Sequence, residues 1–138
     1  MARILGIDYG TKRTGLATTD PLQIIATALE TVPTEAVKSW LENYVRTETV
    51  ERFVLGEPLH EDGNPAQIHD RVLEFRDWLE KTFPDLPVVL QDERYSSVRA
   101  RSVILQSGAK RKKRRDKSLV DKVSAVLILE DYMRENVW

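Results

Sequence analysis

The stretch Arg3-Ile4-Leu5-Gly6-Ile7-Asp8-Tyr9-Gly10-Thr11-Lys12-Arg13-Thr14-Gly15-Leu16-Ala17 decides the fold of this chain. It begins as a short apolar run, places the carboxylate Asp8 where the apolar character ends, and passes through polar and basic residues into a second apolar run. This pattern predicts strands at 3–8 and 14–19 joined by a tight turn. A carboxylate at the end of a buried strand needs a cation, a donor or a turn to satisfy it. Asp8 is therefore either part of a metal or phosphate site or a turn acceptor.

The rest of the chain predicts an α/β fold. A third strand is expected at 26–32, followed by a helix that begins at Pro33 or Thr34 and short buried strands at 53–56 and 88–90. Further helices are expected at 66–82, from Ser96 or Ser97 to Leu105, and at 119–135. Three strands in succession, followed by alternating helices and strands, indicate an antiparallel meander that continues into parallel strands through right-handed crossovers. At 138 residues we expect a single domain over 1–138.

Composition excludes several classes of protein. The chain is 41% hydrophobic and 31% charged, which is typical of a soluble globular protein rather than a disordered one. It has no cysteine, so disulfides and thiolate metal sites are excluded. No apolar run approaches the roughly 20 residues that cross a membrane, and the N-terminus shows no signal-peptide pattern. We expect a cytoplasmic protein without a membrane partner.

The formal net charge of −1 conceals a strongly basic segment at 110–117. This segment holds seven basic residues and one acidic residue, so the rest of the chain holds 14 basic and 21 acidic residues. A solvated charged loop is one interpretation of such a run. We favour nucleic-acid binding, because neutralising phosphates would release counterions and relieve the repulsion among the cations.

Acidic residues follow the expected strands where a site would form. Asp8, Glu57 and the pair Asp92-Glu93 end three strands, and Asp121 lies at the start of the last helix. In open α/β sheets, sites form beyond the carboxyl ends of the strands. Carboxylates that converge there suit hard divalent cations and the two-metal cleavage of phosphodiesters. The two histidines, His60 and His69, are expected on the surface, which disfavours a zinc hydrolase.

Each of these acids also has a structural interpretation. Ser118-x-x-Asp121 matches a helix capping box, so Asp121 taken alone is better explained as a cap. Asp92 could accept hydrogen bonds in a turn, and Glu57 could be a solvated charge. Lys12 and Arg13 could form an exposed pair in the first turn. Only the expected convergence of the acids favours the functional interpretation over these separate ones.

Four motifs together resemble the YqgF/RuvX family, and they occur in the family's order over essentially the whole chain. They are Gly6-Ile7-Asp8-Tyr9-Gly10-Thr11-Lys12-Arg13-Thr14-Gly15, Gly56-Glu57-Pro58-Leu59 with Asp62-Gly63, Asp92-Glu93-Arg94-Tyr95-Ser96-Ser97, and Val120-Asp121-Lys122-Val123-Ser124-Ala125. The resemblance implies an RNase H-like fold, a five-stranded mixed sheet flanked by helices. It also implies a metal-dependent endonuclease that matures the 5′ end of pre-16S rRNA. An older assignment for the family is Holliday junction resolvase.

The resemblance also assigns roles to individual residues. The family's catalytic acids fall on Asp8, Glu93 and Asp121, and Arg94, Ser96 and Ser97 match the rest of the motif around the fifth strand. Two positions depart from the pattern. The family more often has an apolar residue where this chain has Glu57, and related resolvases commonly carry a further acid where Ser124 stands.

The sequence thus leads to one main hypothesis, phosphodiester hydrolysis in structured RNA. Asp8, Glu93 and Asp121 would hold Mg²⁺ or Mn²⁺, with Glu57 as a further candidate ligand. The expected contacts to nucleic acid are Lys12, Arg13, Arg94, Ser96, Ser97, Lys110, Arg111, Lys112, Lys113, Arg114, Arg115 and Lys117. The protein would act as a monomer or a homodimer on a ribosomal precursor RNA or on branched DNA.

Three alternatives stay open. A Holliday junction resolvase would make two symmetric cuts and would therefore act as a dimer. Asp8-x-Gly10-Thr11 also resembles the phosphate turn of actin-like kinases and ATPases, which need two such lobes. A non-catalytic RNA-binding factor in ribosome assembly would keep the basic segment and need no metal.

Overall fold

The opening apolar run forms β1 (Arg3–Asp8), the central strand of a five-stranded sheet with the order β3-β2-β1-β4-β5. The computed structural model describes residues 2–59, 67–93 and 117–138. Strands β2 (Arg13–Thr19) and β3 (Ala26–Pro33) continue the chain as an antiparallel meander. Strands β4 (Val50–Glu57) and β5 (Val88–Asp92) lie on the other side of β1, and both are parallel to their neighbours. The predicted mixed sheet is confirmed.

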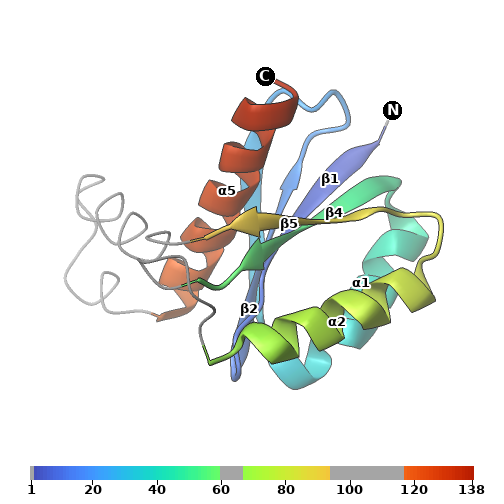
Figure 1. Cartoon of the computed structure of the whole chain (residues 1–138). Helices are drawn as coiled ribbons and strands as arrows, with labels where there is room; N and C mark the ends of the chain where they lie inside the picture. The colour runs from blue at the N-terminus through green and yellow to red at the C-terminus, as the bar shows by residue number, and fades with distance from the viewer. Residues whose placement is uncertain (1, 60–66, 94–116) are drawn as a thin grey trace.

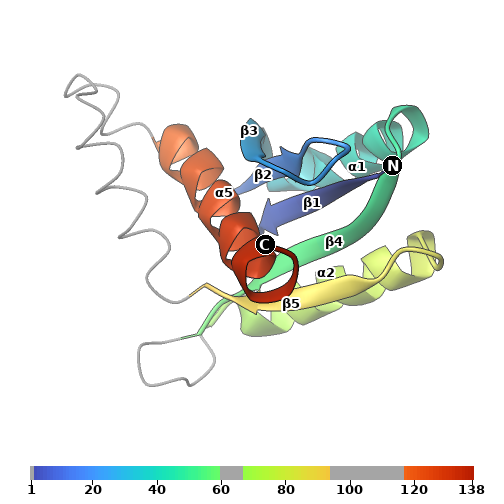
Figure 2. The same cartoon turned by 90° about the horizontal axis from the view of Figure 1, so that it is seen from above.

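Helices cover both faces of the sheet, as Figures 1 and 2 show. Helices α1 (Val37–Thr47) and α2 (His69–Thr82) lie on one face, and α5 (Lys117–Asn136) crosses the other. Strands β4 and β5 point toward the N-terminal end of α5 (Figure 1). That edge of the sheet is where the sequence predicts a site.

Alternation of side chains along the strands divides the core into two clusters. In β1, Leu5 and Ile7 belong to the cluster beneath α1 and α2, whereas Ile4 belongs to the cluster beneath α5. In β4, Leu55 and Val54 divide in the same way. The face of the sheet to which a strand side chain points therefore follows from whether it lies an even or an odd number of residues from these core residues.

Several predicted boundaries differ from the observed ones. The first helix begins as a single 3₁₀ turn, Thr34–Ala36, before α1, and β4 starts three residues before the expected Phe53. Helix α2 begins at His69 rather than at residue 66, and α5 begins at Lys117, inside the basic segment. The helix expected from Ser96 or Ser97 lies outside the described residues. None of the helices in the described part of the chain is both long enough and apolar enough to span a membrane.

Candidate nuclease site

Asp8, the last residue of β1, presents its side chain to the α5 face of the sheet. It lies four residues after Ile4, which packs against α5, and two after Gly6, whose Cα faces Leu129 and Ala125 of that helix. Its strand neighbour in β2 is Gly15. The sequence therefore delivers this carboxylate to a partly buried position between the sheet and α5.

Glu93 reaches the same place from the far side of the sheet. It follows the last residue of β5, and its backbone N–H donates a hydrogen bond to the Glu57 carbonyl at 3.2 Å. Its carboxyl group lies over Gly56 of β4, where an added Cβ would stand 2.8 Å from Glu93 Oε2 and 2.8 Å from Ile128 Cδ1. Glycine at position 56 is thus what leaves room for the Glu93 side chain between β4 and α5.

The side chains of Asp8 and Glu93 are joined by a hydrogen bond in which the Glu93 carboxyl donates to Asp8. Burial raises the pKa of Glu93 to about 10, and the charges of Asp8 and Asp92 add to this effect. Burial also raises the pKa of Asp8 to about 6; the hydrogen bond from Glu93 opposes this rise, whereas the charge of Asp121 adds to it. Near neutral pH, the two carboxyl groups therefore share one proton.

Asp121 is brought to this pair by α5. Its backbone passes directly over Gly15, where an added Cβ would collide with the Asp121 carbonyl oxygen. The side chain does not belong to the first turn of the helix, since α5 begins four residues earlier and that turn holds no acid. Instead, Asp121 Oδ2 accepts a hydrogen bond from Arg13 Nε at 3.0 Å. The capping interpretation of Asp121 is therefore wrong, because the helix starts before the residue expected to cap it.

The structure places two of the predicted phosphate contacts next to the acids. Lys12 is exposed in the turn between β1 and β2, and Arg13 begins β2 on the face that carries Asp121. The sequence analysis does not predict the ion pair between Arg13 and Asp121. Because side chains alternate along a strand, Arg13 shares a face with Gly15 and Ala17, and this is the face that packs against α5. Lys117 is the first residue of α5. Arg94, Ser96, Ser97, Lys110, Arg111, Lys112, Lys113, Arg114 and Arg115 lie outside the described residues.

Glu57 is not brought to the other three acids. It lies two residues after Leu55, so its side chain faces the α1/α2 side of the sheet, opposite to Asp8. There its Oε2 accepts a hydrogen bond from His69 Nε2, the first residue of α2, at 3.0 Å. The side chain of His69 is 15% exposed, so the expectation of a surface histidine is wrong. His60 lies outside the described residues.

Comparison with known proteins identifies the family. The protein-family model described as RuvX, Holliday junction resolvase, matches residues 2–135 of this chain. A Porphyromonas gingivalis protein named "Putative pre-16S rRNA nuclease" is 49% identical over 133 residues, covering 96% of each chain. A Christiangramia forsetii protein of the same name is 47% identical over 135 residues, covering 98% of this chain and all of that one. This chain belongs to the RuvX family.

The fold of this RuvX-family chain is shared with solved resolvases. The fowlpox virus resolvase, crystallised with Holliday junction DNA, aligns with a TM-score of 0.62 and 13% identity over 99% of each chain. RuvC of Thermus thermophilus, in complex with a Holliday junction substrate, aligns with a TM-score of 0.57 and 19% identity over 99% of this chain and 97% of that one. At these identities the likeness is one of fold, and it confirms the RNase H-like architecture.

The side chains at this site suit a divalent cation, which the RuvX family resemblance implies. Asp8 and Glu93 offer only oxygen donors, and their desolvation disfavours ionisation of both carboxyl groups unless a cation is bound. Asp121 adds a third carboxylate, close enough for its charge to raise the pKa of Asp8. The Ser124 hydroxyl, one turn along α5 from Asp121, is buried and has no hydrogen-bond partner among the residues that the structure describes. Across 2–59, 67–93 and 117–138, no three acidic or histidine side chains are already arranged as a ready metal site. The oxygen donors of these residues fit a divalent cation, although the Asp121 carboxylate forms an ion pair with Arg13 in this structure.

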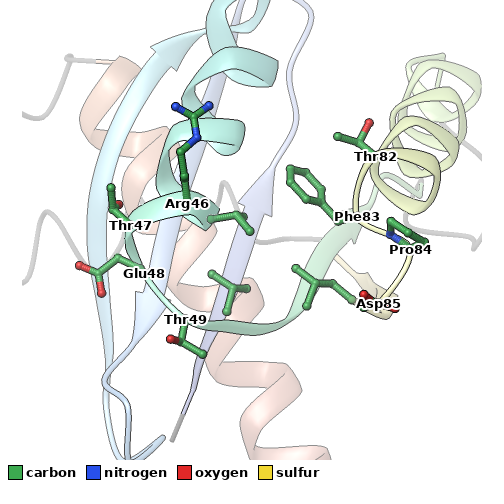
Figure 3. Close-up of a pocket in the computed structure, with 11 residues that line it drawn as sticks. Arg46, Thr47, Glu48, Thr49, Thr82, Phe83, Pro84 and Asp85 are labelled. Atoms are coloured by element: carbon green, nitrogen blue, oxygen red, sulfur yellow. The ribbon is translucent and has the colours of Figure 1, made fainter.

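A surface pocket of about 470 Å³, drawn in Figure 3, lies where β4 and β5 begin, at the end of the sheet opposite to these acids. Its walls are the end of α1 with the turn into β4 and the connection from α2 to β5. Arg46 and Thr82 come from the two helices, and Asp85 comes from the connection. None of the candidate acids lines it, so the proposed chemistry belongs to the open sheet edge rather than to this pocket.

Proposed function

We propose that this protein is a divalent-metal-dependent endonuclease that hydrolyses phosphodiester bonds of structured RNA, with 5′-end maturation of pre-16S rRNA in the cytoplasm as its reaction. The observation that carries the proposal is the buried Asp8–Glu93 carboxyl pair with Asp121 beside it at the carboxyl edge of the sheet. The name of the two close relatives supports RNA as the substrate, and the description of the family model supports cleavage of nucleic acid.

The residues divide into two groups by what they would do. Asp8, Glu93 and Asp121 would hold Mg²⁺ or Mn²⁺, which when bound activates water and stabilises the leaving oxygen. Asp8 and Glu93 are partly buried, which strengthens their electrostatic interactions with bound charge. Lys12 and Arg13 stand at the same edge and would neutralise backbone phosphates without selecting a base sequence.

The decisive experiment compares wild type with Asp8→Asn on a precursor RNA that spans the 5′ end of 16S rRNA, with Mg²⁺ or Mn²⁺ added. We expect wild type to cut the precursor, chelation to stop the reaction, and Asp8→Asn to lose at least about 100-fold in rate, since it removes one anionic ligand. A matched control is Glu80→Ala, which changes an acid 54% exposed on α2. Equal cleavage by wild type and Asp8→Asn would overturn the role of Asp8.

A four-way DNA junction in the same assay separates the alternatives. Cleavage of the junction with no cleavage of the precursor RNA would replace the RNA proposal by a resolvase. RNA binding without any cleavage, and unchanged in Asp8→Asn, would indicate a non-catalytic assembly factor.

A further inference from the structure

The contact between Glu57 and His69 is the feature of this edge that the proposed chemistry does not use. It joins the last residue of β4 to the first residue of α2, with 3.0 Å between Glu57 Oε2 and His69 Nε2. Both side chains are largely shielded, 28% and 15% exposed respectively, so this hydrogen bond is less accessible to water than one on the open surface. It lies on the face of the sheet opposite to Asp8.

The same residue, Glu57, also holds Glu93 through its backbone. The Glu57 carbonyl accepts the Glu93 N–H at 3.2 Å, immediately after Glu57 and Asp92 form the last paired position of β4 and β5. This hydrogen bond is the point at which Glu93 leaves the sheet. The next residue toward the N-terminus, Gly56, lies directly beneath the Glu93 carboxyl group. The end of β4 therefore fixes both the backbone and the side chain of Glu93.

We propose that Glu57 and His69 act together as positioning residues for Glu93, anchoring the end of β4 to α2 so that the Glu93 carboxyl stays against Asp8. The inference rests on the proposed nuclease function and deepens it. Movement of the Glu57 backbone would displace the acceptor of the hydrogen bond from the Glu93 N–H. It would also displace Gly56, on which the Glu93 carboxyl group packs. Such supporting contacts commonly determine how precisely a reacting group is held.

The competing assignments for this pair make different predictions. If Glu57 were a metal ligand, Glu57→Gln would fail as badly as Glu57→Ala, because an amide replaces an anionic donor. If Glu57 is a positioning residue, Glu57→Gln keeps an oxygen that accepts the His69 N–H and preserves function. If the contact only stabilises the fold, its loss lowers the unfolding temperature and leaves the folded enzyme's rate unchanged.

The experiment measures three quantities in wild type, Glu57→Ala, Glu57→Gln, His69→Ala and the double alanine variant. They are the amide hydrogen-exchange rate of Glu93, kcat and KM on the precursor RNA, and the unfolding temperature. Glu80→Ala is the control, since it removes the Arg76–Glu80 ion pair, which joins two residues further along the same helix. All kinetic measurements are made well below the unfolding temperature of each variant.

We expect each single alanine variant to lose about tenfold in kcat with KM changed less than about twofold, and the double variant to lose no more than either, because the residues act as a unit. Glu93 amide exchange should rise about tenfold, while the amides of Val89 and Leu90 in β5 keep their protection. Glu57→Gln and Glu80→Ala should stay within about twofold of wild type in both measurements. Additive losses, unchanged Glu93 exchange, or failure of Glu57→Gln would each overturn the inference.

Failure of the proposed function gives a different result. If wild type does not cleave the RNA, the nuclease proposal falls. Glu93 exchange then still decides the anchoring, because it needs no substrate.

Discussion

The guanidinium of Arg13 lies against the acidic cluster formed by Asp8, Glu93 and Asp121. It therefore supplies part of the positive charge that a bound cation would bring. Its Nε lies 3.0 Å from Asp121 Oδ2, and the two side chains are 40% and 25% exposed. We expect Arg13→Gln to bind Mn²⁺ about three- to tenfold more tightly in calorimetric titrations, because a competing positive charge is removed at a semi-exposed site. The same variant should bind RNA more weakly and with a smaller dependence on salt. Weaker Mn²⁺ binding would show instead that Arg13 holds Asp121 in its ligating position.

At the scale of elements, three glycines determine how closely α5 approaches the sheet, and the first, Gly6, lies under Ala125 and Leu129. Gly15 lies under the Asp121 backbone, and Gly56 lies under Ile128 and Glu93. We expect Gly15→Ala to lower the free energy of unfolding by about 1–3 kcal/mol, because the new methyl group meets a backbone oxygen that cannot rotate away. Cleavage should fall further than stability accounts for, since Asp121 moves with the helix. Thr27→Ala, at an exposed position of the neighbouring strand, is the control, and equal effects of the two variants would contradict this account.

The elements also show what sequence patterns could and could not determine. Apolar runs ending in Asp8 and in Asp92-Glu93 predicted two strands of the sheet and the edge where acids would meet, because parallel strands share one carboxyl edge. Glu57 was grouped with them because strand ends indicate an edge but not a face. Side chains alternate from Leu55 to Glu57, which places Glu57 on the face opposite to Asp8. This assignment requires the register between β4 and β1, which the sequence does not provide. The start of α5 was missed because lysine and arginine, which mark a charged loop, are also good helix formers.

At the scale of the whole molecule, the two ends of the sheet have different characters. The edge at Asp8 gathers carboxyl groups, and the basic segment 110–117 precedes Asp121 in the chain. The other end carries exposed apolar side chains on the β2–β3 connection and at the C-terminus. Trp138 Nε1 donates a hydrogen bond to the Gln23 carbonyl there, so the chain end is tied to the fold far from the acids. Changes at that end should therefore leave the site chemistry unaffected.

The acidic cluster makes the stability of the whole metal-free protein depend on pH. The pKa of Asp8 rises from 3.8 to about 6 on folding, and that of Glu93 rises from 4.5 to about 10. A raised carboxyl pKa favours the folded state fully below the unfolded value, and this contribution is lost as pH rises through the folded value. For Asp8 the loss therefore falls between about pH 4 and pH 6, and Glu93 extends it to higher pH.

Asp8→Asn removes the Asp8 carboxyl group, and with it the charge and the hydrogen bond that help to raise the pKa of Glu93, so the variant reports on the coupled pair. We expect the variant and wild type to be equally stable near pH 4, and the variant to be more stable by about 1–3 kcal/mol near pH 7, where burying Asp8 as an anion is unfavourable. Chemical denaturation at several pH values in a chelator measures the difference. Saturating Mg²⁺ should stabilise wild type near pH 7 and close the gap, because it binds the carboxylates that the variant lacks. If the stability difference does not change with pH, or if Mg²⁺ does not reduce it, then Asp8 and Glu93 are not a pair of carboxyl groups whose ionisation a bound cation favours.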